Sequence, residues 1–437
     1  MRRLLIAAVA LLGLGGGLGA TASAAVEIQE LVSETGVPFW LVEEDAVPIV
    51  AVEIEFTGGA RLDPQDRAGL ANMLAGLLDK GSGDLDAVAF SDRSDEIGAR
   101  LGFGAGRDSV SASARMLAED PVPGAELLNL ALTEPRFDAD AVERARGRIL
   151  SSIASDETDP SAVASKAWFA RAFPDHPYGR PSDGTAESVA AISVEDLRAG
   201  HTRLLTRARA TVAIVGAIGA AEAKALVDRI FAGIPEGETP APVDEAPAPP
   251  AGIEVIGLDV PQSVAVFGHP GIPRDDPDFF AAFVVNHVLG GGGFSSRLMQ
   301  EVREERGLAY GVYASLADLD AADLVIGRVQ TQNARMAESL DVIRDEWRRI
   351  AEAGLSAEDL DKAKRYLTGA FPLRFDSNAK IAGYLVFLQK EGLGAAYLTE
   401  RNDRVEAVTL EDAARVARRL YDADALSIVV VGEPAGL

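Results

Sequence analysis

Hydrophobic and polar positions alternate along the chain with two different periods. The runs Val47–Phe56 and Ser263–His269 are rich in β-branched residues and predict strands. Ala337–Leu355 instead carries apolar residues at helical spacing and predicts a helix that ends near a glycine. Gly98–Leu117 alternates only partly, which is typical of antiparallel sheet with one covered face. The pattern therefore predicts an α+β fold, with helices packed on one face of each mainly antiparallel sheet.

The same pattern occurs twice, at an offset of about 216 residues. The first matched pair is a helix-like segment, and the second is the strand that follows it and ends in glycine. The third is another helix-like segment, rich in acidic and basic residues. The pairs are 192–205 with 408–421, 212–216 with 428–432, and 137–146 with 355–364. We therefore expect a duplicated unit of about 200 residues.

Between the two copies lies a stretch rich in proline, alanine and acidic residues, Pro235–Gly252. Such a composition cannot form a core and predicts an extended, semi-rigid linker. The expected organisation is an N-terminal domain over residues 25–235, a linker over 236–252 and a C-terminal domain over 253–437. The linker is long enough for the two domains to face each other as a clam.

The first 24 residues have the pattern of a secretory signal peptide. Arg2 and Arg3 precede an apolar run, and Ala22–Ala24 supplies a small-residue cleavage site. The protein is therefore expected to be periplasmic or secreted. An uncleaved membrane anchor is the alternative, although the apolar run is short and broken by glycines. No later segment is apolar enough to predict a stable membrane span.

Charge and cysteine content narrow the function classes. The formal net charge is −25, so nucleic acid is not an expected partner, because phosphate contacts need clustered Lys and Arg. The absence of cysteine excludes disulfides, thiolate metal sites and a cysteine nucleophile. The acidic surface could attract basic peptides, but solubility is the simpler interpretation.

The segment "AGLANMLAGLLDKGS", Ala68–Ser82, predicts an amphipathic helix with Asn72 and Gly76 on one face. A metallopeptidase would carry two histidines at this spacing. The four histidines of the chain lie far apart in sequence, and none has an H-x-x-E-H partner. A site assembled from distant histidines remains an alternative.

Two further segments could contact a substrate. Leu289–Leu298 lacks the ending of a phosphate loop and predicts a flexible loop before a helix capped by Ser295 or Ser296. Beyond it, a helix should run to about Arg306 with Arg303 in its last turn, and Gly307 should cap it in the left-handed conformation. A strand should begin at Leu308, with Tyr310 just inside it. A guanidinium and a phenol at such a corner could stabilise an oxyanion. On spacing alone, a surface pair of Arg303 with Glu304 and a core position for Tyr310 is the simpler interpretation.

The sequence resembles the pitrilysin/insulinase-like zinc metallopeptidases, in particular the short two-domain branch that includes mitochondrial processing peptidase. Four stretches carry the resemblance, in the family's order and over nearly the whole mature chain: "GGARLDPQDRAGLANMLAGLLDKGS", "HPYGRPSDGTAESVAAISVEDL", "GGGGFSSRLMQEVREERGLAYGVYASL" and "IVVVG".

By this resemblance, the family's H-x-x-E-H motif falls on residues 72–76. Asn72 and Gly76 then replace the two histidine ligands, and Ala75 replaces the general-base glutamate. The family's third ligand would fall at Glu143, although a solvated helix residue is the simpler interpretation there. The resemblance thus implies no metal or cofactor in this chain and no peptide hydrolysis by the chain alone.

The family's second motif, R-x-x-x-x-x-x-Y, is matched by Arg303 and Tyr310. The resemblance implies that this pair binds the substrate carbonyl and the tetrahedral intermediate. It further implies a non-catalytic subunit of a heterodimeric zinc endopeptidase, whose homologous partner carries H-x-x-E-H and the zinc. Gly290, Gly291, Gly292 and Gly293, with an edge strand near residues 102–113, would line the path of the peptide substrate. The alternatives are a non-enzymatic peptide-binding or assembly scaffold, and a stand-alone enzyme with an unrecognised site.

Overall fold

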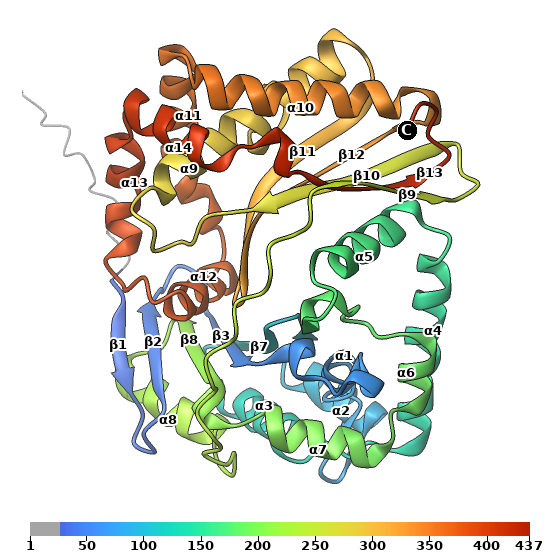
Figure 1. Cartoon of the computed structure of the whole chain (residues 1–437). Helices are drawn as coiled ribbons and strands as arrows, with labels where there is room; N and C mark the ends of the chain where they lie inside the picture. Colours follow the sequence, from blue (N-terminus) through green and yellow to red (C-terminus); the bar gives the residue numbers. More distant parts are fainter. Residues whose placement is uncertain (1–26) are drawn as a thin grey trace, which may run out of the picture.

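Two open sheets form the frame of the protein, and the computed structural model describes residues 27–437 (Figure 1). The proposed signal peptide lies outside these residues. The first sheet has the order β1-β2-β8-β3-β7-β6 and the second β11-β12-β10-β13-β9. The strands of the first are β1 (Gln29–Val32), β2 (Pro38–Glu43), β3 (Ile49–Thr57), β6 (Arg100–Ala105), β7 (Ser109–Leu117) and β8 (Ala210–Gly216). Those of the second are β9 (Gly252–Gly257), β10 (Gln262–Pro270), β11 (Ala309–Leu319), β12 (Ala322–Gln332) and β13 (Ser427–Gly432).

The two sheets repeat one topology, apart from the additional strand β1. In each, a single parallel pair, β2 with β8 or β9 with β13, adjoins a run of antiparallel strands. The α+β class with two similar halves is therefore confirmed. Strands β6 and β11 occupy equivalent edges of their sheets, so the expected edge strand corresponds to β6, and β7 lies one place further in.

Each half contributes its own set of helices, and all but one helix of each set cover one face of that half's sheet. In the first half they are α1 (Leu70–Ala75), α2 (Ala87–Glu96), α3 (Val122–Thr133), α4 (Ala139–Asp156), α5 (Pro160–Ala172), α6 (Ala186–Ala191), α7 (Val194–Leu204) and α8 (Ala220–Ile230); β4 (Gly81–Ser82) and β5 (Leu85–Asp86) form a small ribbon among them. In the second half they are α9 (Phe279–Asn286), α10 (Met336–Ala353), α11 (Ala357–Gly369), α12 (Asn378–Lys390), α13 (Tyr397–Ala407) and α14 (Leu410–Leu420). Helices α7 and α14 both begin with a capping box, Ser193 with Asp196 and Thr409 with Asp412.

Two helices are exchanged between the halves. Helix α5 packs on β10 and β13 of the second sheet, and α12 packs on β3 and β8 of the first (Figure 1). The Trp168 indole of α5 donates a hydrogen bond to the Ser427 carbonyl at 2.9 Å, and Gln389 Nε2 of α12 donates to the Val212 carbonyl at 3.0 Å. Each sheet is therefore covered by its own helices on one face and partly by a borrowed helix on the other.

The segment between the halves packs against the protein along its course. Residues 235–251 contain no helix or strand. Val243 and Ala246 pack beside the buried cluster around Trp168, and the Ala246 amide donates to the Ala321 carbonyl at 2.8 Å. These contacts hold the linker beside α5 and the β11–β12 turn.

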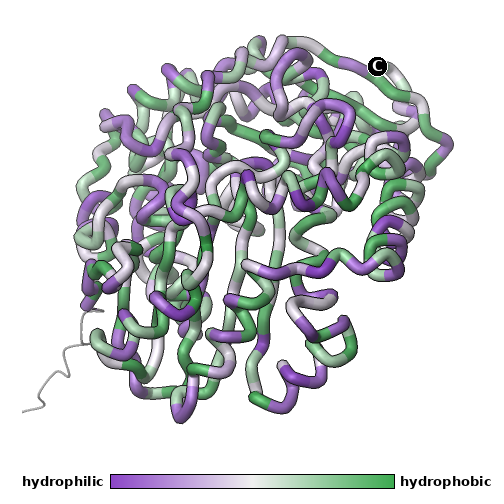
Figure 2. Tube along the Cα trace, turned by 90° about the horizontal axis from the view of Figure 1, so that it is seen from below, coloured by the Kyte–Doolittle hydropathy of each residue, from purple (hydrophilic) through white to green (hydrophobic). Residues whose placement is uncertain are grey.

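Separate hydrophobic clusters fill each half, and a third lies between α5 and the second sheet. Along the chain trace, hydrophobic and hydrophilic residues are interspersed, and hydrophilic positions are frequent on turns at the periphery (Figure 2). Among residues 27–437, no helix is both long and apolar enough to cross a membrane.

One helix is shorter than the sequence predicts. Helix α1 ends at Ala75, and Gly76 is its C-cap, so the expected helix through Ser82 is wrong. The Leu77 and Leu78 amides form i→i−3 hydrogen bonds, to the Leu74 and Ala75 carbonyls, and the chain then turns into β4. Glycine is the poorest helix former after proline, which favours termination at this position.

Candidate functional site

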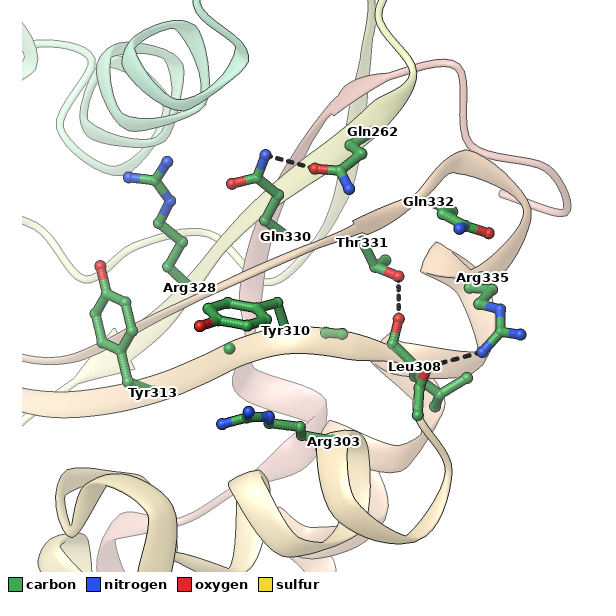
Figure 3. A pocket seen from close by; sticks show the side chains of 13 residues that line it. Gln262, Arg303, Leu308, Tyr310, Tyr313, Arg328, Gln330, Thr331, Gln332 and Arg335 are labelled. Carbon is green, nitrogen blue, oxygen red and sulfur yellow. Dashed lines mark hydrogen bonds between the residues drawn. The ribbon is translucent and has the colours of Figure 1, made fainter.

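The corner between the helical segment Met299–Glu305 and β11 positions Arg303 and Tyr310. The segment has π-helical geometry, and Gly307 follows with φ of +59°, the left-handed conformation predicted for it. Strand β11 then starts at Ala309, one residue before Tyr310. The sharp reversal brings the two side chains to the same edge of the second sheet (Figure 3).

Arg303 lies between two aromatic rings. Its guanidinium carbon is 4.9 Å from the ring centroid of Tyr310 and 4.6 Å from that of Phe294. Tyr310 is 85% exposed, so the core position suggested by spacing alone is wrong. Arg303 Nε approaches Glu304 at 3.5 Å, but its buried Nη1 has no hydrogen-bond partner among the described residues. The stack therefore holds the guanidinium in place and leaves one donor unused.

Both residues line a cavity of about 920 Å³ that opens along β11 and β12 (Figure 3). Arg328 and Arg335 add two further guanidinium groups to its walls, and no carboxylate of residues 27–437 lines it. Gln330 Nε2 donates to Gln262 Oε1 at 2.9 Å, which fixes two side-chain amides on the wall. The cavity therefore presents donors suited to peptide carbonyls and carboxylates.

The glycine-rich segment forms short helical turns where the sequence predicted a flexible loop: a π-helical turn over His287–Gly291 and a 3₁₀ turn over Gly293–Ser295. Gly290 is buried, and a Cβ there would lie 2.6 Å from the Ala314 amide nitrogen of β11. The Asn286 side chain donates to the Ala314 carbonyl at 3.2 Å, so this turn closes the outer edge of β11. Gly291, Gly292 and Gly293 remain at least partly accessible. As expected, Ser296 caps the next helix, because its hydroxyl accepts from the Met299 amide at 3.4 Å.

Asn72, Ala75 and Gly76 line a separate pocket of about 320 Å³ in the first half. Phe103 of the edge strand β6 also lines this pocket. The pocket shares no lining residue with the Arg303 cavity. The Asn72 amide donates to Asp183 at 3.3 Å. The two groups of residues singled out in the sequence thus form two pockets, one in each half.

The pocket around Asn72 does not fit a zinc ion. Helix α4 presents Ala145, Arg148 and Ile149 to it, which adds a guanidinium but no ligand. Among residues 27–437, Asp79 is its one acidic lining residue, next to Lys80, and no histidine lines it. Glu143, also on α4, is not one of the residues that line this pocket. Its side chain is 68% exposed and pairs with Arg146 at 3.2 Å. Across residues 27–437, no three His, Asp or Glu side chains gather as a metal site, and this range includes all four histidines.

Known proteins match the chain over both halves. The family model described as insulinase (peptidase family M16) matches residues 40–186, and that described as peptidase M16 inactive domain matches residues 191–367. An uncharacterized zinc protease of Mycobacterium leprae is 31% identical over 342 residues, 76% of this chain and 76% of that protein. The chain belongs to the M16 family of peptidases.

Two other M16-like proteins share its organisation. A non-peptidase homolog of Helicobacter pylori is 26% identical over 364 residues, 83% of each chain. A Pseudomonas fluorescens structure described as a peptidase M16 inactive domain superposes with a TM-score of 0.89 at 29% identity, covering 94% of this chain and 98% of that one. The present chain therefore has the M16 fold.

The sequence did not single out several residues of this M16 protein's larger cavity. Arg328 and Gln330 alternate with buried Val329 and Thr331 along β12, a period-2 signal that could have indicated a polar inward face. Phe294 carried no such signal. It reaches Arg303 only because the turn at Gly293, with φ of +58°, brings it back over the helix.

Proposed function

We propose that this chain is the non-catalytic subunit of a heterodimeric zinc endopeptidase of the periplasm. In this proposal a homologous subunit carries H-x-x-E-H, the zinc ion and the general base. Arg303 and Tyr310 of the present chain then bind the substrate carbonyl at that zinc site and stabilise the tetrahedral intermediate. The periplasmic location rests on the signal-peptide pattern of the first 24 residues.

The observation that carries the proposal is an exposed Tyr310 stacked on Arg303 in one half, while the pocket around Asn72 in the other half is unsuited to metal. An 85% exposed tyrosine beside an arginine with an unused donor is poorly explained by stability, because neither group is satisfied within the chain. A phenol and a guanidinium supply O–H and N–H donors to an oxyanion without any metal of their own. They would act on a zinc-bound substrate held by another subunit.

The peptide path of this proposal uses β6 and the accessible glycines. Strand β6 is an edge strand, and an extended peptide can add to such an edge through backbone hydrogen bonds. Gly291, Gly292 and Gly293 leave the backbone accessible beside the Arg303 stack. Gly290 would contribute by seating this turn against β11.

The test combines the chain with the H-x-x-E-H subunit and measures kcat/KM on an unfolded peptide. Arg303→Ala and Tyr310→Phe should each lower kcat/KM by about 10²-fold to 10³-fold, the effect of removing an oxyanion donor. Arg348→Ala is the matched control, because Arg348 is a half-exposed arginine that pairs with Asp345 and lines neither pocket. Unchanged kcat/KM in both test variants, with assembly intact, contradicts the assigned roles.

A non-enzymatic scaffold is the second candidate, and the non-peptidase homolog of Helicobacter pylori favours it. In that case the Arg303 cavity would bind a peptide segment without cleavage. A purified complex that binds peptide but shows no zinc-dependent hydrolysis would support this candidate. Hydrolysis by the isolated chain that a chelator abolishes would instead indicate a stand-alone enzyme.

A further inference from the structure

A second cavity, of about 560 Å³, lies among α9, α11, α12, α13 and β11. Half-buried aromatic rings form much of its wall, including Phe280, Phe283, Tyr384 and Phe387. His287 stacks on Tyr366 at 5.0 Å between ring centroids and adds a flat surface to the same wall. This volume and aromatic lining are typical of sites that bind small organic molecules.

The charge on this wall is positive, in contrast to the chain as a whole. Arg274, Arg374 and Arg401 line the cavity, and no aspartate or glutamate of the described part of the chain does, although the chain carries a net charge of −25. Arg274 is neutralised by Asp318 at 2.8 Å. The other two arginines have no carboxylate within 4.0 Å among residues 27–437, so their charges are uncompensated there.

Arg401 is the more unusual of the two, because it is only 5% exposed. Its Nη1 donates to the Leu367 carbonyl at 2.9 Å and to Asn402 Oδ1 at 2.8 Å. Its guanidinium carbon lies 4.4 Å from the Phe371 ring centroid. Within the described chain, its Nε and Nη2 make no hydrogen bond. A buried cation without a counter-ion is costly, so a bound anion would relieve a penalty already present in the fold.

We propose that this cavity binds an organic carboxylate that carries an aromatic group. The planar guanidinium of Arg401 can hold a carboxylate through two parallel hydrogen bonds, and Arg374 adds a second positive charge at the rim. The half-buried rings of Phe280 and Phe283 offer the surface on which an aromatic group would pack. Two sources share this chemistry: the C-terminal residue of a peptide and a free aromatic acid.

This inference does not depend on the proposed subunit function, because every residue it uses lies outside the Arg303 cavity. Strand β11 nevertheless connects the two sites. Tyr310 and Tyr313 line the first cavity, whereas Ser315 and Leu316, further along the same strand, line the second. A peptide end bound here would therefore lie along the strand from the Arg303 stack.

The experiment titrates the isolated chain by calorimetry with N-acetyl-L-phenylalanine and with N-acetyl-L-phenylalaninamide, two probes that differ in the charge of one group. We expect the acid to bind with a Kd of about 1 mM or tighter and the amide to bind at least about tenfold more weakly. A third probe, an N-acetylated peptide of four alanines and a C-terminal phenylalanine, distinguishes the sources. Tighter binding of this peptide assigns the site to chain ends, and weaker binding assigns it to free acids.

Arg374→Gln and Arg401→Gln should each weaken binding of the acid at least about fivefold, since each removes a positive charge. Arg365→Gln is the control, because this exposed arginine of α11 pairs with Asp361 and lies outside the cavity lining. Arg374 is exposed, so its variant decides the matter if the Arg401 variant does not fold. No binding of the acid, equal affinity for acid and amide, or unchanged affinity in Arg374→Gln overturns the proposal.

Discussion

The guanidinium carbon of Arg303 lies 4.9 Å from the ring centroid of Tyr310, yet only the arginine is substantially covered by protein. An 85% exposed tyrosine gives up little buried surface when it is truncated. Tyr310→Ala should therefore change the free energy of unfolding by no more than about 0.5 kcal/mol. Urea titration followed by circular dichroism measures this value, and a loss near 2 kcal/mol would assign Tyr310 a structural role.

Trp168 should behave in the opposite way. This side chain is fully buried between α5 and the second sheet, and its indole donates to the Ser427 carbonyl. Trp168→Ala should lower the free energy of unfolding by about 3–5 kcal/mol. Trp168→Phe keeps part of the packing and should cost less. Both variants should still unfold in one transition, because α5 joins the two halves; two resolved transitions in the wild type would contradict this coupling.

Zinc affinity tests the pocket around Asn72. A Cβ at Gly76 would meet only the Asn72 and Met73 carbonyls, at 3.5 and 3.7 Å, so position 76 can accept a side chain in the variant Asn72→His/Ala75→Glu/Gly76→His. Two imidazoles alone should bind zinc weakly. Adding Ile149→Glu, which replaces a residue of α4 that lines the pocket, should tighten binding at least about tenfold in a chelator competition.

The comparison of these two zinc variants also tests Glu143. If the triple variant binds zinc as tightly as the quadruple variant, a native carboxylate completes the site. The native carboxylates to distinguish are Glu143, the position that the family resemblance suggested, and Asp79, which lines the pocket; Glu143→Gln in the triple variant should weaken zinc binding only if Glu143 is the ligand.

Glu53 gives the stability of the fold a defined pH dependence. It lies on β3 on the face opposite the first half's core; burial raises its pKa to about 7, Arg115 opposes this shift and Glu55 adds to it. Glu55 is itself paired with Lys390 of α12 at 3.1 Å. Because the folded pKa of Glu53 exceeds its unfolded value, this contribution to stability is full below about pH 4.5 and is lost as pH rises through about 7.

In Glu53→Gln this contribution is removed. Between pH 5 and pH 8, the wild type should lose about 1 kcal/mol more unfolding free energy than the variant, a value reduced for the solvent that still reaches this side chain. Urea titrations at the two pH values measure the difference. Parallel pH profiles of the two proteins would show that Glu53 is not the titrating group.

The local pattern of hydrophobic and polar positions was enough to predict most of the fold. The expected strands at 47–56 and 263–269 correspond to β3 and β10, and the repeat offset predicted two similar halves, although not the strand order that they share. The exchange of α5 and α12 was not predictable in this way, because an apolar stripe shows that a helix is buried but does not show which sheet it covers. Similarly, the sequence spacing of Arg303 and Tyr310 predicted that they flank a helix-to-strand corner, but it did not predict that the tyrosine is exposed.

The second cavity shows a different limit. Arg374 and Arg401 lie in segments whose charges look unremarkable in a sequence with 42 lysines and arginines. Only the packing of α11, α12 and α13 separates these two from the carboxylates that neutralise most of the others. Uncompensated charge is a property of the three-dimensional arrangement, so no motif marks it.

The borrowed helices also bear on how such a gene can change. A gene that encoded only the first half would place the apolar side of α5 in water and leave the β3–β8 surface without α12. The reciprocal fragment would have the same two defects. Point substitutions can therefore alter the pocket around Asn72 while the frame persists, but truncation to a single repeat cannot restore an ancestral one-domain protein.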